Sequence, residues 1–237
     1  MFMYYNLAVL VLVLILNQVN AGRIIGGHEA AAHSRPYMAL VEGSDSTNCG
    51  GFLVSEDFVL TAAHCKSSSY KVCVGMNEYD DKNKLCFSVK QDFPHEKYNN
   101  ETYSNDIMLL KLSTRAVFSN KVKPIYLAEE LQLSLPKICI VTGWGKTCKD
   151  NDRMSHKLME ANVTLIYNDI YAKDKVYYSK GEKGPGEGDS GGPLVCENGK
   201  AYGVVSASRD LPSGSRLYKY TKIPDNRKWI DEIMKHN

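Results

Sequence analysis

The chain has 237 residues, of which 43% are hydrophobic and 24% charged, a composition typical of a globular protein with a large core. Its formal net charge at pH 7 is only +2, which argues against nucleic-acid binding and against strong adhesion to an anionic surface. The seven cysteines are an odd number, so one thiol is left over or bonds to another molecule if the others pair.

The chain begins with an apolar run at residues 7–16, which is too short to span a bilayer comfortably. The run ends before Val19-Asn20-Ala21, where small or modest side chains occupy cleavage-type positions. We therefore predict that residues 1–21 are a secretory signal peptide, with an uncleaved membrane anchor as the alternative. No later stretch is long and apolar enough to cross a membrane, so we expect no membrane span in the mature form. Secretion follows an oxidising route, in which most cysteines pair.

A basic residue follows directly, in Gly22-Arg23-Ile24-Ile25-Gly26-Gly27. A lone Arg before two β-branched residues and two glycines predicts proteolytic processing after Arg23, which makes residues 22–23 an activation dipeptide. The alternative is an ordinary turn that leads into a strand.

From residue 37 onward, short apolar or alternating segments recur between turn signals. Strands are predicted at Tyr37–Val41, Gly51–Val54, Phe58–Ala62, Tyr70–Val74, Leu85–Gln91, Ile107–Leu112, Lys137–Gly143, Asn162–Ile166, Pro193–Cys196 and Ala201–Ser206. This spacing favours an all-β sandwich or barrel over alternating βαβ units. The segment 113–124 is the predicted crossover between two halves.

Only the C-terminal end has a helical pattern. Trp229, Ile230, Ile233 and Met234 fall on one helical face, and Asp225 is positioned to cap the start of the helix. The apolar face is expected to pack against the core.

Two sequons mark candidate glycosylation sites, Asn100-Glu101-Thr102 and Asn162-Val163-Thr164. The first lies in a polar stretch. The second lies in a predicted strand, so its use depends on which way Asn162 faces.

Three residue types with complementary chemistry are spread along the chain. Ser190 lies between glycines in the hexapeptide GDSGGP (188–193), a turn that exposes a hydroxyl and brings backbone N–H groups together. His64 follows the predicted strand at 58–62, and Asp106 directly precedes the predicted strand at 107–112. Taken singly, the three are an inert turn serine, a structural histidine and a capping aspartate. Together they are a nucleophile, a base with a pKa near neutrality, and a carboxylate that orients the base.

The order of the motifs identifies a family. IIGG (24–27), TAAHC (61–65), NDIMLLKL (105–112), GWGK (143–146) and GDSGGP (188–193) occur in the order and rough spacing of the chymotrypsin-like serine proteases, and the chain resembles the granzyme and mast-cell protease branch. The resemblance implies an all-β fold of two antiparallel six-stranded β-barrels with a C-terminal helix. It also implies a single peptidase domain at 24–237, with barrels at about 24–120 and about 121–237.

The resemblance implies a role for each residue of the site. Ser190 would be the nucleophile, His64 the general base and then acid, and Asp106 the orienting carboxylate, itself supported by Ser206. The N–H groups of Gly188 and Ser190 would form the oxyanion hole.

The resemblance also implies a zymogen. Cleavage after Arg23 would free the amine of Ile24 to pair with Asp189. The expected product is a serine endopeptidase that needs no cofactor and no metal, and that is secreted or stored in secretory granules. Its expected partners are protein or peptide substrates, an activating protease, and serpin-type or other protein inhibitors.

The cysteines follow the family in part. The resemblance pairs Cys49 with Cys65 and Cys139 with Cys196. Cys73 and Cys86 flank a polar, turn-like stretch at 75–84 and are predicted to staple a hairpin. Cys148 would then be the odd thiol.

The specificity pocket departs from the family. By alignment it is formed by Gly184, Ser206, Ser208 and Tyr218, and Gly184 replaces the aspartate that selects Lys and Arg. Ser208 and Tyr218 stand where glycines often open the pocket, which predicts a shallow or partly blocked pocket. The segment 171–190 is also short, as if the family's intermediate helix and loop were mostly deleted. The alternative function is therefore a weakly active or inactive protease-like binding or signalling protein.

Overall fold

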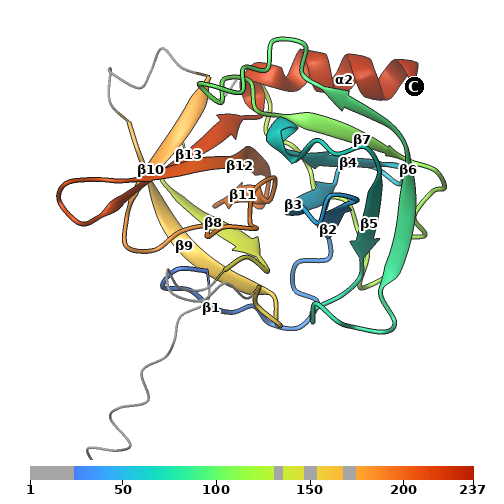
Figure 1. Ribbon diagram of the computed structural model, residues 1–237, viewed down its shortest axis with the longest axis horizontal. Helices are drawn as coiled ribbons and strands as arrows, with labels where there is room; N and C mark the ends of the chain where they lie inside the picture. The colour runs from blue at the N-terminus through green and yellow to red at the C-terminus, as the bar shows by residue number, and fades with distance from the viewer. Residues whose placement is uncertain (1–23, 131–135, 147–153, 168–174) are drawn as a thin grey trace, which may run out of the picture.

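The computed structural model describes residues 24–130, 136–146, 154–167 and 175–237, and the predicted signal peptide, Arg23 and Cys148 lie outside these ranges. The first of its two barrels closes in the order β2-β3-β4-β7-β6-β5 (Figure 1). Its strands are β2 (Met38–Gly43), β3 (Asn48–Leu53), β4 (Phe58–Thr61), β5 (Tyr70–Val74), β6 (Leu85–Pro94) and β7 (Met108–Leu112).

The second barrel runs β9-β10-β13-β12-β11-β8 and closes by pairing β8 with β9. Its strands are β8 (Ile138–Gly143), β9 (Met159–Ile166), β10 (Val176–Gly181), β11 (Pro193–Cys196), β12 (Ala201–Asp210) and β13 (Arg216–Lys222). A short strand, β1 (His28–Glu29), pairs with β9 at its edge. The predicted fold of two six-stranded antiparallel barrels is confirmed.

Alternating side chains explain why these strands close around a core. On β9, Met159, Ala161, Val163 and Leu165 are buried, while Asn162 faces solvent. A period of two is what a barrel requires, since successive side chains point to opposite faces of a strand. The sequon at Asn162 is therefore presented outward, and Asn100 is exposed in a turn.

The ends of the chain are exchanged between the barrels. Strand β1 pairs with β9 of the second barrel, whereas Ile230 of the C-terminal helix is buried in the apolar cluster that contains the strands of the first barrel. Figure 1 shows this helix, α2 (Arg227–His236), lying across the top of the first barrel. Each end thus ties its own half of the chain to the other barrel.

The start of the helical region differs from the prediction. Asp225 lies within a short 3₁₀ turn, η2 (Pro224–Asn226), and the residue before α2 is Asn226, which makes no side-chain capping bond. Asp225 therefore does not cap α2. The apolar face does pack inward: Ile230 is fully buried, and Trp229, Ile233 and Met234 pack against the same core cluster.

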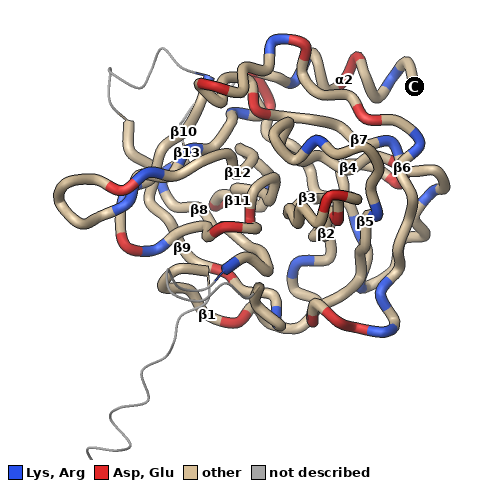
Figure 2. Tube along the Cα trace, viewed as in Figure 1, with Lys and Arg blue, Asp and Glu red and all other residues tan. Residues whose placement is uncertain are grey.

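Three disulfides join Cys49 to Cys65, Cys73 to Cys86 and Cys139 to Cys196. The last two connect residues that are directly opposite on paired strands. Charged residues of both signs are distributed over both barrels (Figure 2), in keeping with the small net charge. Within the described ranges, no helix is long and apolar enough to cross a membrane.

Candidate active site

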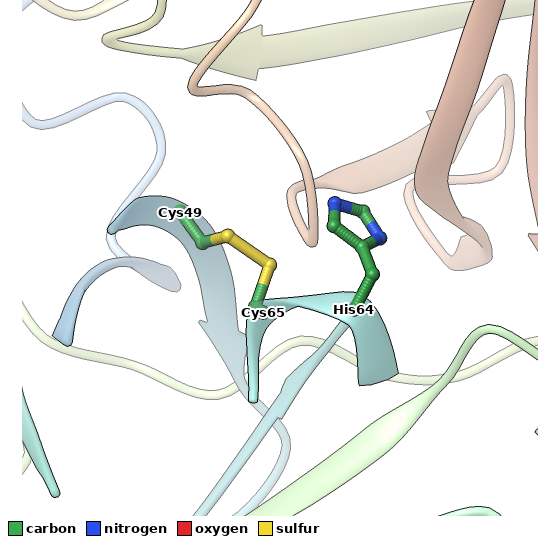
Figure 3. Close-up of side chains that lie close together, drawn as sticks. All are labelled: Cys49, His64 and Cys65. Carbon is green, nitrogen blue, oxygen red and sulfur yellow. A yellow bond between two sulfur atoms is a disulfide. The ribbon is translucent and has the colours of Figure 1, made fainter. Parts of the chain in front are cut away.

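His64 is fixed by its place in the chain. It lies on a one-turn 3₁₀ helix, η1 (Ala63–Cys65), immediately after β4, and the next residue is bonded to Cys49 of β3 (Figure 3). Both cysteine sulfurs near the imidazole are used in this disulfide. The bridge anchors the turn that carries His64 to the neighbouring strand.

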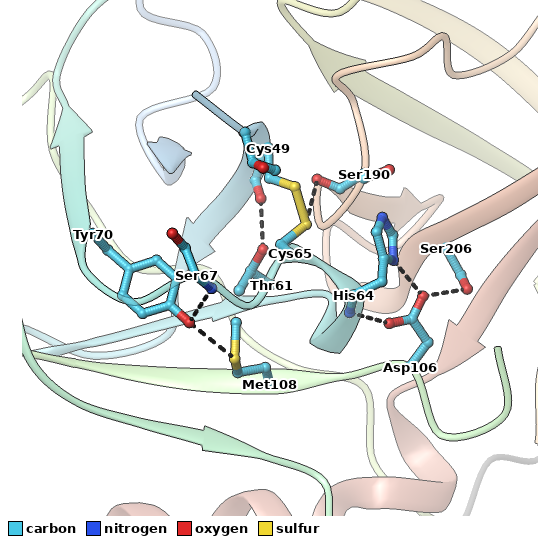
Figure 4. The surroundings of a disulfide bond; sticks show 12 residues. Cys49, Thr61, His64, Cys65, Ser67, Tyr70, Asp106, Met108, Ser190 and Ser206 are labelled. Atoms are coloured by element: carbon cyan, nitrogen blue, oxygen red, sulfur yellow. Dashed lines mark hydrogen bonds and ion pairs between the residues drawn. A yellow bond between two sulfur atoms is a disulfide. The ribbon is translucent and has the colours of Figure 1, made fainter. Parts of the chain in front are cut away.

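Asp106 is a fully buried carboxylate whose oxygens are all used. Oδ1 accepts the backbone N–H of His64 at 2.9 Å, and Oδ2 lies 2.8 Å from Nδ1 of the same histidine. Oδ2 also accepts the hydroxyl of Ser206 at 2.6 Å (Figure 4). A buried charge needs such partners to offset the loss of water. The three bonds fix the orientation of the imidazole.

Ser190 lies on the other side of the imidazole, which Figure 4 shows between Asp106 and Ser190. The structure has no hydrogen bond between the Ser190 hydroxyl and His64, a contact that often tightens only when substrate binds. The carbonyl of Ser190 accepts the N–H of Gly50 on β3 at 2.7 Å, which ties the serine loop to the first barrel. The two barrels therefore meet at the site, one supplying the His and Asp, the other the Ser.

The loop before Ser190 presents unused donors. Gly188 has a φ of +92°, which a residue with a Cβ rarely adopts. Within the described part of the chain, the N–H groups of Gly188 and Ser190 make no hydrogen bond, whereas that of Asp189 donates to Gly186. Two free N–H groups beside a serine hydroxyl can stabilise an oxyanion.

Asp189 is buried beneath this loop, with 1% of its surface exposed. Its carboxylate accepts the N–H groups of Gly145 at 2.7 Å and Gly186 at 2.8 Å. Burial raises the pKa of Asp189 to about 7, although these two hydrogen bonds act to lower it. No ion pair to Asp189 forms within the described residues, so none of them supplies a counter-charge to this carboxylate.

Ile24, the residue after the predicted processing site, is fully buried in the core of the second barrel. The next residue bridges to Gly184, whose N–H donates to the carbonyl of Ile25 at 3.1 Å. Ile24 has a φ of +46°, a genuine outlier for a β-branched residue. The segment is therefore docked in place with a strained backbone at its first described residue.

A cavity of about 300 Å³ opens beside Ser190. Two of the four expected pocket residues, Ser206 and Ser208, line it, and Gly184 and Tyr218 do not. Tyr218 is fully buried, and a Cβ on Gly184 would lie 2.5 Å from its ring, so the ring packs directly on the Gly184 backbone. The phenol hydroxyl has no hydrogen-bond partner among the described residues. Tyr218 thus fills the space beside Gly184 instead of lining an open pocket.

The sequence reasoning missed Arg216, which lies on β13 and lines the same cavity. Its Nε donates to Oδ1 of Asp210 at 2.9 Å, and this bond raises the pKa of Arg216 further. Glu187 also lines the cavity, and its Oε2 lies 2.7 Å from Nζ of Lys146. No motif pointed to Arg216, because its approach to the cavity depends on how β13 pairs with β12.

The predicted deletion concerns the segment 171–190. The described part of this segment, residues 175–190, contains strand β10 and no helix.

Comparison with known proteins agrees with this geometry. Residues 24–230 match the family model described as Trypsin. The chain is similar to granzyme B of Rattus norvegicus, with 40% identity over 92% of this chain and 94% of the relative. It is likewise similar to duodenase-1 of Bos taurus (41% identity, covering 91% and 90%) and to mast cell protease 3 of Ovis aries (40%, covering 91% and 90%). The chain therefore belongs to the trypsin family, as a chymotrypsin-like serine endopeptidase related to granzymes and mast cell proteases.

Proposed function

We propose that the protein is a secreted or granule-stored serine endopeptidase that is made as a zymogen, is activated by cleavage after Arg23, and cleaves poorly after Lys or Arg. The observation that carries the zymogen proposal is Asp189, a buried carboxylate to which no described residue supplies a counter-charge. Residues 24–237 would form the mature peptidase domain, after removal of the signal peptide 1–21 and the dipeptide 22–23.

In the proposed reaction, the hydroxyl oxygen of Ser190 attacks the carbonyl carbon of the scissile peptide bond. Nε2 of His64 takes the hydroxyl proton, while Nδ1 keeps its bond to Asp106. The N–H groups of Gly188 and Ser190 stabilise the oxyanion. Collapse of the tetrahedral intermediate breaks the C–N bond, and His64 returns the proton to the leaving amine. His64 then takes a proton from a water molecule whose oxygen attacks the acyl carbon, and the ester bond to Ser190 breaks as His64 returns the proton to the serine oxygen.

Activation would supply what Asp189 lacks. Cleavage after Arg23 creates a charged α-amine at Ile24, a residue whose side chain is already buried in the second barrel. Cleavage also relieves the strained φ at Ile24, because this dihedral is defined by the carbonyl carbon of Arg23, which cleavage detaches. The new amine would pair with Asp189 and fix the loop that carries Gly188 and Ser190. An activating protease that cleaves after a basic residue is implied.

Two features support poor cleavage after Lys and Arg. Tyr218 occupies the space beside Gly184, so a long side chain finds no deep slot. The permanent charge of Arg216 on the cavity wall disfavours a substrate cation, and the carboxylate of Glu187, which also lines the cavity, is paired with Lys146. Small side chains fit such a pocket best.

Hydrolysis of a peptide library by the processed protein tests the proposal, with Ser190→Ala as the inactive control. We expect cleavage that requires processing, is lost in Ser190→Ala, and disfavours Lys and Arg before the cut bond. A profile dominated by cleavage after Lys or Arg would refute the specificity. The filled space at Tyr218 favours the alternative, a protease-like binding protein, and complete processing without any peptide cleavage would support it. Serpin-type inhibitors are the expected regulators of the active form.

A further inference from the structure

A second cavity, of about 620 Å³, lies between the segment 97–105 and strands β10 and β13. Three lysines line it, Lys97, Lys175 and Lys219, together with polar side chains that include Thr102, Ser104 and Asn105. No acidic side chain lines it within the described part of the chain. Three cations around one concave surface create a positive potential that attracts an anion.

The wall of this cavity is held in a defined shape. Nζ of Lys219 donates to the carbonyl oxygens of Thr102 at 2.9 Å and Tyr103 at 3.0 Å. Nδ2 of Asn105 donates to the carbonyl of Lys97 at 2.9 Å. Tyr103 and Asn105 both have positive φ, +52° and +51°, and these bonds hold the segment in that conformation. These bonds fix the backbone of one wall of the cavity, to which Lys97 and Lys175 present exposed side chains.

The charges of Lys97 and Lys175 act on their surroundings. Neither forms an ion pair with a described residue. Burial lowers the pKa of His95, and the charges of Lys175 and Lys97 lower it further, although Glu96 acts in the opposite direction. Glu96 itself accepts the indole N–H of Trp229 at 3.3 Å. The charges of both lysines thus reach His95, where Glu96 opposes them with a larger effect than either lysine alone.

The second cavity adjoins the site at Ser190. Lys219 is the direct cross-strand partner of Ala207, and Ala207 lines the cavity beside Ser190. On the other side, the ring of Tyr103 packs edge-on against His64 with centroids 5.5 Å apart. An extended peptide advances about 3.3 Å per residue. A peptide bound at Ser190 therefore reaches the lysines within a few residues.

We propose that this cavity is a substrate subsite that binds the carboxylate of an Asp or Glu side chain located within four residues of the scissile bond. The inference rests on the proposed function, because it requires a peptide to occupy the cavity at Ser190. An acidic substrate residue fits better than a long polyanion, since the cavity adjoins the reacting groups and lies where an extended substrate would pass.

The test uses protein secreted from the full chain and processed after Arg23. Octapeptides carry Glu or Gln at one position at a time, four on each side of the cut bond. We expect Glu to raise kcat/KM about fivefold over Gln at one position, the size of a single favourable ion pair. The ratio should fall toward one in Lys97→Gln/Lys175→Gln and return in Lys97→Arg/Lys175→Arg. The matched control, Lys121→Gln/Lys123→Gln, removes two exposed lysines outside the cavity and should keep the ratio.

A second measurement keeps the proposal testable if no peptide is cut. In processed Ser190→Ala protein, a rhodamine-labelled octapeptide with Glu at one position should bind about fivefold tighter than its Gln counterpart at one of the positions tested, and the difference should vanish in Lys97→Gln/Lys175→Gln. If this lysine-dependent binding were seen but processed wild-type protein cleaved no peptide, the proposed activity would be overturned and the subsite would stand. A Glu-to-Gln ratio near one, or one that survives loss of both lysines, would overturn the subsite. Lysine-dependent binding of heparin with no preference for Glu peptides would overturn it as well.

Discussion

The pH dependence of stability before and after processing follows directly from Asp189. Burial raises the pKa of this carboxyl from 3.8 to about 7 in the unprocessed chain. A difference of about three pKa units between the folded and unfolded states corresponds to about 4 kcal/mol. Between about pH 4 and about pH 7 the folded protein keeps a proton that the unfolded chain has lost. The contribution is therefore fully present below about pH 4 and is lost as the pH rises to about 7.

The assay is urea unfolding of the unprocessed protein at a series of pH values, in a Ser190→Ala background that prevents self-cleavage. The matched variant Asp189→Asn is nearly isosteric and does not titrate. Subtracting its free energy of unfolding removes the contributions of all other groups, which titrate alike in both proteins. We expect the difference between the two proteins to change by about 4 kcal/mol across this range, with the aspartate protein losing stability as the pH rises.

Processing after Arg23 should reverse the sign. Once the α-amine of Ile24 pairs with the carboxylate, the folded-state pKa of Asp189 falls below its unfolded value, and the aspartate protein gains stability as the pH rises through the acid range. A flat difference between the unprocessed proteins would refute the claim that Asp189 is buried without a counter-charge. The same slope in processed and unprocessed protein would refute the proposed ion pair.

Three further substitutions test other parts of the site and fold. Ser206→Ala removes the 2.6 Å bond to Asp106 and should lower kcat/KM about tenfold in peptide hydrolysis; a change under twofold would contradict the supporting role. Tyr218→Phe removes a buried hydroxyl that has no partner, so the urea midpoint should stay or rise, whereas Tyr218→Gly should open the pocket and shift a cleavage profile toward large side chains; an unchanged profile would contradict the filled-pocket account. Cys73→Ala/Cys86→Ala opens a loop with a sequence separation of 13 and should cost about 3 kcal/mol in urea unfolding, and a loss below about 1 kcal/mol would show that the bridge adds little.

The strands with clear apolar runs or clear alternation were predictable from the sequence, whereas β10 and β13 were not. The segments that became β4, β7, β8, β11 and β12 are dominated by apolar residues, so their burial was evident. In strand β13 the half-buried Arg216, Lys219 and Lys222 alternate with pairs of buried residues, and β10 contains Lys180. Neither strand was predicted. Both are stabilised by pairing along their length with each other, a long-range interaction that local patterns do not report.

The candidate site divides in the same way. Motif order pointed to His64, Asp106 and Ser190, and the structure brings all three together. The cavity walls could not be inferred as well, since they depend on the register between β12 and β13. Arg216 was missed for this reason, and Tyr218, which was expected to block part of the pocket, packs its ring on Gly184 and does not line the cavity beside Ser190. Asp225 was assigned as a cap because a helix start cannot be located from the pattern to within one residue.

The most direct test of the central claim is the rate at which a fluorophosphonate probe labels Ser190 before and after cleavage at Arg23. The account predicts slow labelling of the unprocessed protein, rapid labelling after processing, and loss of that increase in Asp189→Asn, with Arg23→Gln as the form that cannot be processed. Equal labelling of processed and unprocessed protein would contradict activation through Asp189. No labelling after complete processing would contradict the assignment of Ser190 as the nucleophile.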